Sequence, residues 1–466
     1  MKFYVQLFLI LMFSLPFVLF SQETEKPLVV MGDSLKGKVL NGETVREVIG
    51  NVKITQGKIE ITCNKAIQYL ERNTIELIGN VIVTEDTLIV KTPHGFYFEN
   101  ENKTFSDTSI FLTNGKMSLT AKHGMYLVKL KEAYFADSVR LKDSTTVLRA
   151  DSLIYYEKFN KAVAIGNVEV EDTSTIIYAD SLIHWRKINN TFAYGNIELY
   201  DKQNKITLKG EALQDYKNKK YTKVLGRPVL MKIDSTQDGQ TDTLFIESDL
   251  LEAFNDTTGK LSANDSVLIF RGNFSSVNNN TVYFRKKDKI LIFKTENEDA
   301  QPVLWYEQTQ VTGDSIVIYL ENNQIKLIDI FGNALIVSLN EGYDYRYNQI
   351  AGDTLNLVFE KGDLVRTDVT GSVLSIYYLF EEEEPNGLLK SSAQKAKIFF
   401  EDNKVTNVKL YGSPASEYHP EALIKGKERE FVLPSFIIYE NKPDKNKFLH
   451  RFNKMRKNGK YIEIKK

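Results

Sequence analysis

Two histidines are the residues of this sequence whose type and spacing first suggest chemistry. His94 and His123 lie 29 residues apart in a chain that has five histidines. If 29 residues is a structural period, the two imidazoles could lie side by side on adjacent strands and bind a metal ion. Two ligands are too few for a stable site without carboxylate support, and ordinary surface positions are the alternative. We expect no metal site and no cofactor.

Carboxylates recur at the same spacing. Asp151 and Asp180 each follow a small residue in the middle of a β-type segment, which favours bend residues over a catalytic dyad. The single cysteine, Cys63, takes the small-residue position of this pattern and is interpreted as a packing residue; one cysteine excludes an internal disulfide. The sequence has no phosphate-binding glycine loop, His-Glu-x-x-His or Gly-x-Ser-x-Gly motif. We therefore predict that the protein is not an enzyme.

These spacings belong to a six-fold internal repeat. Four copies share the pattern Gly-Asn, aliphatic, any residue, aliphatic, and they lie at 50–54, 79–83, 166–170 and 195–199. Two copies that lack the Gly-Asn pair complete the 29-residue period, starting at Thr108 and Asp137. A fixed period of this length is typical of one supersecondary unit stacked on itself.

The repeat predicts bent β-strands around an apolar interior. Its aliphatic positions alternate with other residues, which is the two-residue period of a strand with one buried face. A second strand in each unit starts aliphatic and then turns small. Glycine inside a strand marks a bulge or bend, so we predict two walls hinged along a spine. The predicted lining is Val52, Ile54, Ile61, Val81, Val83, Val90, Phe96, Phe98, Ile110, Leu112, Leu119, Val139, Leu141, Leu148, Val168, Val170, Ile177, Ile197 and Leu199.

The two ends of the chain differ in character. Residues 1–21 have Lys2, an apolar run from Leu7 to Phe13 and small polar residues near Ser21, which predicts a secretory signal peptide; a transmembrane anchor is the alternative. Residues 441–466 form a basic tail, for which we weigh a solvated, disordered end against contact with anionic lipid headgroups or an acidic partner. With 60 Lys and Arg against 61 Asp and Glu, nucleic acid is not an expected partner.

The 29-residue repeat becomes less regular towards the C-terminal end of the sequence. The strict period ends near Gly195, a looser copy follows at 226–229, and residues 234–242 form a polar insertion that suggests a boundary. From Asp265 onward the units are longer and irregular. We therefore predict a β-repeat domain over residues 28–232 and a second, more irregular β domain over residues 243–440.

Taken together, the repeated strands resemble a known family. Gly-Asn-Val-x-Val/Ile strands, such as 166–170, alternate with Ala-Asp-Ser-Leu-Ile strands at 150–154 and 179–183. This pattern resembles the OstA/LptA family of lipopolysaccharide-transport proteins, clearly from Val39 to Val229 and more weakly from Asp265 to Pro414. The resemblance implies an all-β fold in which stacked, bent antiparallel strands form an elongated V-shaped β-jellyroll, here as two consecutive modules. It also implies a periplasmic location, with outer-membrane association left open.

The resemblance further implies a function in lipid transport. Members bridge the inner and outer membranes and hold the acyl chains of lipopolysaccharide, or here a related glycolipid, in an apolar groove. Each methylene buried in such a groove contributes about 0.8 kcal/mol. Partners would be other transport components docked by edge strands or end to end, and self-association is a further option. The alternatives are a structural β-solenoid-like scaffold or adhesin with a filled core, and a polysaccharide-processing enzyme, for which we find no carboxylate cluster.

Overall fold

The structure is a computed structural model that describes residues 29–56, 58–235, 241–321, 324–382, 384–401 and 404–455. The predicted signal peptide lies outside these ranges. The described residues form 32 strands, which pair with antiparallel neighbours, and two short α-helices. None of the helices in these ranges is long and apolar enough to cross a membrane.

Two compact units divide the described chain. The N-terminal unit contains the residues up to Gln203 and Gly210–Lys220, and the C-terminal unit contains Asn204–Lys209 and the residues from Tyr221. Strand β16 (Ile206–Tyr216) therefore contributes to both units. The polar segment 234–242 includes the connection between two strands of the C-terminal unit, β18 and β19.

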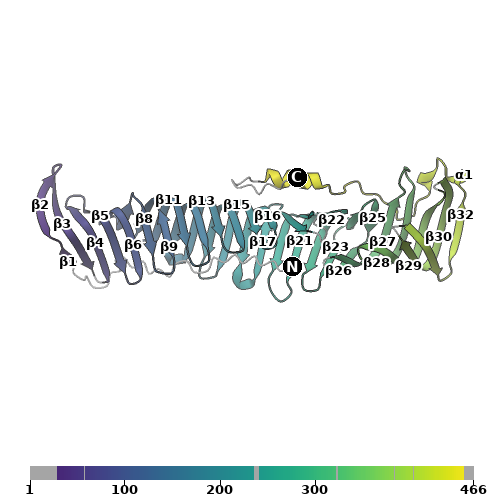
Figure 1. Ribbon diagram of the computed structural model, residues 1–466, viewed down its shortest axis with the longest axis horizontal. Helices are drawn as coiled ribbons and strands as arrows, with labels where there is room; N and C mark the ends of the chain where they lie inside the picture. Colours follow the sequence, from purple (N-terminus) through teal and green to yellow (C-terminus); the bar gives the residue numbers. More distant parts are fainter. Residues whose placement is uncertain are drawn as a thin grey trace. The chain divides into compact units, whose positions relative to one another are not determined.

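The N-terminal unit is a stack of antiparallel strands in which most strands lie beside their neighbours in the sequence, as β13, β14 and β15 do (Figure 1). Besides β16, its strands are β1 (Val29–Met31), β2 (Ser34–Leu40), β3 (Glu43–Gln56), β4 (Ile59–Tyr69), β5 (Thr74–Glu85), β6 (Leu88–Phe98), β7 (Lys103–Ser106), β8 (Ile110–Thr113), β9 (Ser118–Ala121), β10 (His123–Leu127), β11 (Glu132–Lys142), β12 (Val147–Tyr156), β13 (Lys161–Glu171), β14 (Thr175–Trp185) and β15 (Asn190–Asp201).

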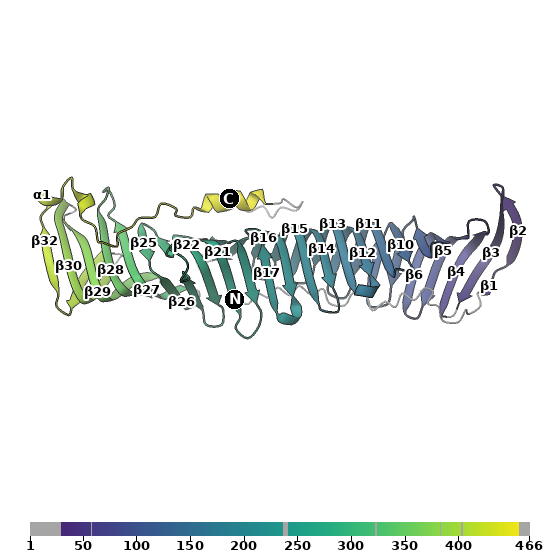
Figure 2. The same ribbon diagram turned by 180° about the vertical axis from the view of Figure 1, so that it is seen from behind.

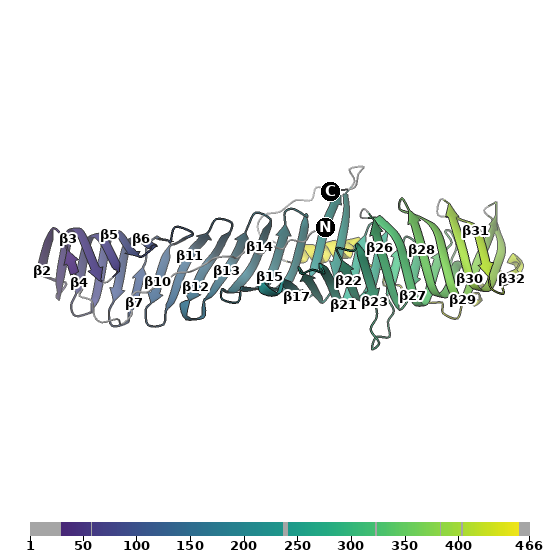
Figure 3. The same cartoon turned by 90° about the horizontal axis from the view of Figure 1, so that it is seen from below.

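The C-terminal unit continues with β17 (Tyr221–Leu225), β18 (Val229–Ser235), β19 (Thr241–Glu247), β20 (Leu250–Phe254), β21 (Lys260–Arg271), β22 (Phe274–Phe284), β23 (Lys289–Phe293), β24 (Val303–Tyr306), β25 (Thr309–Thr312), β26 (Ser315–Glu321), β27 (Gln324–Leu339), β28 (Tyr347–Glu360), β29 (Asp363–Glu381), β30 (Glu384–Glu401), β31 (Lys404–Tyr411) and β32 (Ala415–His419). Two helices, α1 (Glu421–Ile424) and α2 (Lys445–Lys454), follow the last strand. Its long strands lie side by side when seen from below (Figure 3).

Each Gly-Asn pair of the repeat bends its strand through a β-bulge. Gly166 and Asn167 both have positive φ angles, of 78° and 45°, and the pairing register between β13 and β14 shifts between Ile165 and Val168. The carboxylate of Asp151 on β12 accepts a hydrogen bond of 2.9 Å from the Asn167 side-chain amide. The same arrangement recurs between Asp180 and Asn196, at 2.7 Å. The bends divide the unit into two walls.

One of the two copies that lack the Gly-Asn pair still bends by the same backbone geometry. Asp137 and Ser138 have φ angles of 61° and 57°, and the backbone N–H of Lys122 donates to the Asp137 carbonyl at 3.1 Å. At the other copy the strand is interrupted, because β7 ends at Ser106 and β8 begins at Ile110. The bend, not the glycine, is therefore the constant element of five of the six copies.

We call the strand halves that follow the Gly-Asn bends of β3, β5, β13 and β15, with their partners, wall A, and the opposite halves wall B. The interior row of wall A that lies away from the bends consists of Val30, Ile54, Ile61, Val83, Val90, Leu112, Leu119, Leu141, Leu148, Val170, Ile177 and Leu199. The corresponding row of wall B consists of Arg46, Gln68, Ile75, Tyr97, Thr104, Tyr126, Ala133, Tyr155, Ala162, His184 and Thr191. We name them the aliphatic row and the polar row.

The C-terminal unit carries apolar clusters on both faces of one wall. On β27, Ala334 belongs to the interior cluster, whereas its neighbour Leu335 belongs to a second cluster on the opposite face. Residues 420–455, which we call the C-terminal strap, cover this second face: Ile424 and Leu433 are buried there. Figures 1 and 2 show the strap running back along the unit from β32 to α2.

Part of the basic tail is a docked helix, where the sequence favoured a solvated end. Asp444 caps α2 by accepting a hydrogen bond from the Asn446 backbone N–H. Phe448 and Phe452, four residues apart and so on one helix face, are buried, and the Phe448 ring stacks on that of Phe245 with a centroid distance of 5.4 Å. The spacing of these two phenylalanines explains the helix. The described residues thus confirm the predicted all-β class of stacked, bent antiparallel strands, with short helices added at the end.

Candidate functional site

The space between the two walls of the N-terminal unit contains a cavity of about 590 Å³. Wall A lines it with aliphatic side chains, including Val30, Ile61 and Val90. Wall B faces them with the first part of the polar row, from Arg46 to Ala133. Known ligand pockets cover roughly 300–1,000 Å³, so this cavity is large enough for an apolar ligand.

The two walls differ in chemistry. The aliphatic row consists only of Val, Ile and Leu, whereas the polar row presents a guanidinium, amide and hydroxyl groups along with aromatic rings. Burial, with the nearby charge of Glu99, raises the pKa of Tyr97. Because the polar row lies away from the bends, a ligand held here would have its apolar part near the bends and wall A and its polar part near this row.

Small residues of wall B provide part of the space. Gly95 on β6 and Ser106 on β7 both line the cavity, next to the cross-strand pair of Phe96 and Phe105. A Cβ atom on Gly95 would have its nearest neighbours at 3.7 Å, which is ordinary van der Waals contact. By contrast, a Cβ atom on Gly124 would lie 2.9 Å from a terminal methyl of Ile110, so there the space is already filled. Gly95 therefore faces open volume.

Large side chains end the cavity at β11. Phe135 is its last lining residue in sequence, and Leu153 and Tyr155 on the next strand are 1% and 3% exposed. Burial and the nearby Glu157 raise the pKa of Tyr126, whose hydroxyl donates to Glu157 Oε2 at 3.3 Å. Further along, His184 hydrogen-bonds Thr191 at 2.9 Å, and burial lowers its pKa to about 4. A buried neutral histidine here is a packing residue.

One buried carboxyl lies at the rim of wall A. Glu85 ends β5 and is 8% exposed, and its Oε2 has no hydrogen-bond partner among the described residues. Burial raises its pKa to about 7, and the negative charges of Asp86 and Glu157 add to the shift. With a pKa of about 7, the Glu85 carboxyl is about half protonated at neutral pH.

The predicted lining residues fall into two groups. Ile54, Ile61, Val81, Val83, Val90, Phe96, Ile110 and Leu112 line the cavity. Val52, Leu119, Val139, Leu141, Leu148, Val168, Val170, Ile177, Ile197 and Leu199 are buried outside the cavity lining, each at most 6% exposed. Phe98 lies in neither group: its ring stacks on that of Phe96 at 5.9 Å, with the Lys103 ammonium 4.6 Å from its centroid.

The sequence did not identify the polar row. On β14 the buried positions are Ile177 and Ala179 before the bend but Leu182 and His184 after it, so the interior changes from odd to even positions. The opposing β13 carries the bulge, which accounts for the shift. A strict two-residue period continued through the bend selects the opposite face of wall B, from which Phe96 still reaches the cavity lining but the polar row is absent. The register shift at each bend is the signal that finds Arg46, Gln68 and Tyr97.

His94 and His123, for which adjacent strands were one possibility, do not lie on adjacent strands. Strand β7 lies between β6 and β10, because each repeat contributes two strands and equivalent positions are two strands apart. Each histidine instead pairs with carboxylates: His94 with Glu76 at 2.8 Å, and His123 with Asp137 at 2.8 Å. Within the described ranges, no group of three or more His, Cys, Asp or Glu side chains is placed to hold a metal ion.

Comparisons with known proteins show which family this chain resembles. Residues 25–155 match the family model described as OstA-like protein, and no curated protein matches. Sixteen solved chains match; one is LptH of Pseudomonas aeruginosa, described as the LptA-homologous periplasmic component of a lipopolysaccharide transport device. It is 15% identical, the match covers 28% of this chain and 76% of that one, and the TM-score is 0.15. The family match contains all of the cavity-lining residues. The resemblance to the OstA/LptA family is confirmed by the family match over residues 25–155.

Proposed function

We propose that the protein binds lipopolysaccharide or a related glycolipid during its transport between membranes, and that the N-terminal cavity holds acyl chain. The apolar cavity between the two walls carries this proposal. Transfer of a methylene from water to such a site contributes about 0.8 kcal/mol, so an acyl chain gains affinity with each carbon it places between the walls. The family match over residues 25–155 supports the same function, since all of the cavity-lining residues lie within it.

The extent of the cavity limits how the lipid is held. Its lining runs from β1 to β11, whereas later members of the aliphatic row, such as Leu141 and Leu148, are 0% and 2% exposed. We propose that β1–β11 hold the lipid and that β12–β15 of the same unit form an extension with a packed interior. This reading assigns the scaffold role, which the sequence left as an alternative, to one part of the chain.

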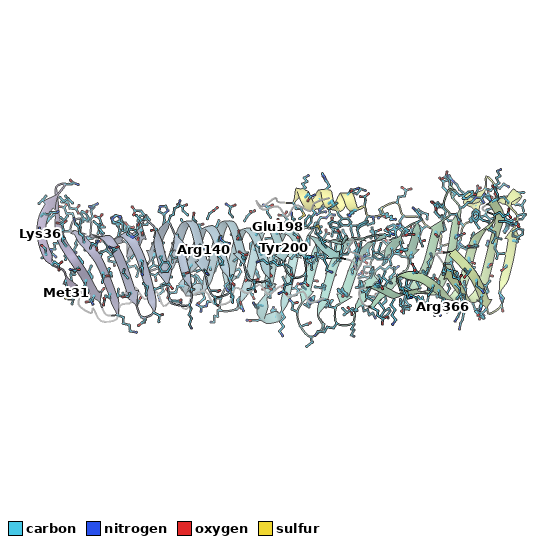
Figure 4. The ribbon with its side chains drawn as sticks, in the orientation of Figure 1. Met31, Lys36, Arg140, Glu198, Tyr200 and Arg366 are labelled. Atoms are coloured by element: carbon cyan, nitrogen blue, oxygen red, sulfur yellow. The ribbon has the colours of Figure 1, made fainter. Side chains whose placement is uncertain are left out.

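The first strands are the proposed docking edge for another transport component or a second copy. Among the described residues, β1 and β2 pair only with β3, which leaves their outer edges without a strand partner. Met31, Leu35 and Val39 are 51%, 72% and 68% exposed there; Figure 4 labels Met31 and Lys36 on these strands. An unpaired edge strand with apolar side chains favours strand addition. Because Val30 and Leu35 also line the cavity, such docking would extend the apolar surface.

Site-specific photo-crosslinking in cells tests the proposal. A photoreactive residue at Val83, which lines the cavity, should form an adduct with lipopolysaccharide. The same residue at Ile82, the next position on β5 and outside the lining, is the matched control. No adduct from Val83, or equal adducts from both positions, would contradict the proposal.

A crosslinker at Val168 tests the extent of binding. Val168 is 1% exposed and lies beyond the cavity, so it should give no lipid adduct. An adduct there as strong as that from Val83 would show that lipid passes through the whole unit, and the packed extension would be ruled out.

A further inference from the structure

The cavity contains a cation that no acidic group neutralises. Arg46 lies on β3, lines the cavity and is exposed to it. Within the described residues its guanidinium has no ion pair and no hydrogen bond. An arginine presents a planar set of donors that match a phosphate or carboxylate group. The position of Arg46 at an apolar cavity therefore bears on which ligands the cavity can bind.

Two neighbouring cations on the opposite face, Lys38 and Lys65, are paired. Glu47, next in sequence and on the other side of the strand, accepts Lys38 at 2.8 Å and also pairs with Lys65. These two lysines hold the pKa of Glu47 near 2. Two cations thus share one carboxylate outside the cavity, while Arg46 inside it has none.

The register leaves room beside Arg46. Gly37 on β2 is its direct cross-strand partner, and a Cβ atom built on Gly37 would meet nothing within 4 Å. On the other side, Gln68 on β4 is the direct partner and adds an amide donor to the same face. Gly37, Arg46 and Gln68 thus form a short row with an open position, a cation and a neutral donor.

The acidic side chain of this cavity lies away from that row. Glu99 follows β6, and β4 and β5 separate β6 from β3. Three strand spacings of about 4.8 Å place the two backbones roughly 14 Å apart. Glu99 therefore lies several strands away from Arg46 along the polar row, and only Arg46 has the exposed first strands beside it.

We propose that Arg46 binds the acidic headgroup of an amphiphile whose acyl chain lies in the cavity. The ligand class is then an acidic lipid, with the phosphate or carboxylate at the Gly37–Arg46–Gln68 row and the chain directed towards Val48 and Leu77 near the bends. This inference rests on the proposed function and adds the group that determines which lipids bind well.

Binding of three amphiphiles of equal chain length to the full chain tests this inference. The probes are a lysophosphatidic acid, a fatty acid and a neutral monoacylglycerol, titrated calorimetrically at low salt. At least one acidic probe should bind about 10- to 100-fold more tightly than the neutral one, as expected for hydrogen bonds to a charged group. The two acidic probes distinguish a phosphate site from a carboxylate site.

Variants test whether Arg46 causes the preference for acidic probes. Arg46→Gln should abolish the preference for acidic probes and leave the affinity for monoacylglycerol unchanged, and Arg46→Lys should restore part of it. Lys36→Gln is the matched control, because Lys36 lies on the adjacent strand and follows the cavity-lining Leu35, so its side chain points to the opposite face. The Lys36→Gln variant should prefer the acidic probes as strongly as the wild type does.

The possible failures are distinguishable. If monoacylglycerol binds but the wild type shows no preference, or if Arg46→Gln retains it, the Arg46 inference is wrong and the lipid-binding proposal stands. Equal loss in Lys36→Gln would also contradict a specific role for Arg46. If none of the three probes binds to the wild type, the proposed function itself fails.

Discussion

Asp151 lies directly over Gly166, so that a Cβ atom on Gly166 would come within 2.3 Å of the Asp151 Oδ2 atom. The glycine also has a φ angle of 78°, in the left-handed region that costs other residues roughly 1–2 kcal/mol. Close approach and backbone conformation thus require glycine at the same position.

Gly166→Ala should therefore destabilise the N-terminal unit by about 1–2 kcal/mol or more, because it adds a steric clash to the backbone cost. Thermal unfolding followed by circular dichroism measures the shift. Gly37→Ala is the control, since a Cβ atom there meets nothing within 4 Å. An unchanged midpoint for Gly166→Ala, or an equal shift for both variants, would contradict the assigned role of the bend.

Gly95→Leu should fill the cavity while leaving the fold intact. Gly95 has no positive φ angle, and a Cβ atom at this position makes only ordinary contacts, so the added side chain projects into open volume. We expect at least a tenfold loss of monoacylglycerol affinity with a melting temperature within a few degrees of the wild type. Gly95→Ala, which adds only the tolerated Cβ atom, should bind nearly as the wild type does, and full affinity in Gly95→Leu would show that ligands bind elsewhere.

The Glu85 carboxyl should make stability depend on pH. Its pKa in the folded chain is about 7 against an ordinary value of 4.5, mainly because of burial. A raised carboxyl pKa means that the folded state binds the proton more tightly. Its ionisation therefore lowers stability as the pH rises from about 4.5 to about 7, and no further change follows above that range.

Glu85→Gln should remove this dependence. The variant should gain about 1–2 kcal/mol relative to the wild type between pH 5 and pH 8, with allowance for solvent screening at the rim. Melting temperatures of both proteins at the two pH values measure the effect. Glu60→Gln, which removes an exposed carboxylate paired with Lys53 at 2.9 Å, should leave the slope unchanged; identical slopes for wild type and Glu85→Gln would refute the assignment.

The sequence was sufficient to predict which residues of wall A face the interior, but it was insufficient for wall B. The aliphatic positions of wall A follow the repeat without interruption, so a two-residue period finds Ile54, Val83 and Val90 in the cavity lining. Past the bend, the bulge changes which residues face inward, and the same period selects Phe98 instead of Tyr97. Only the pairing register, which the sequence does not display, reveals that change.

The C-terminal strap could not be predicted from the sequence, for a different reason. Its contacts join residues far apart in the chain: Gln310 donates to the Ile437 carbonyl at 2.8 Å and accepts from the Tyr439 backbone N–H at 2.9 Å. Gln349 holds Phe431 and Leu433 in the same way. A periodic pattern predicts neighbouring strands, but it carries no signal for an irregular segment held by two buried glutamines.

Phe448→Ala should release α2 from the C-terminal unit. The Phe448 ring is 3% exposed and stacks on Phe245, which is itself fully buried. Truncation of a buried phenylalanine costs about 3–5 kcal/mol, which exceeds what a ten-residue helix can supply by its own propensity. Limited proteolysis should therefore cleave the variant between residues 440 and 455 at least tenfold faster than the wild type.

Lys447→Ala is the matched control for the helix, because Lys447 is exposed on α2 beside Phe448. It should be cleaved at the wild-type rate, and the Arg451–Glu247 ion pair, which also ties α2 to β19, should remain. If Phe448→Ala were cleaved no faster than Lys447→Ala, the helix would be held by its charged contacts alone. Faster cleavage confined to Phe448→Ala would instead show that burial of the phenylalanine face fixes the end of the strap.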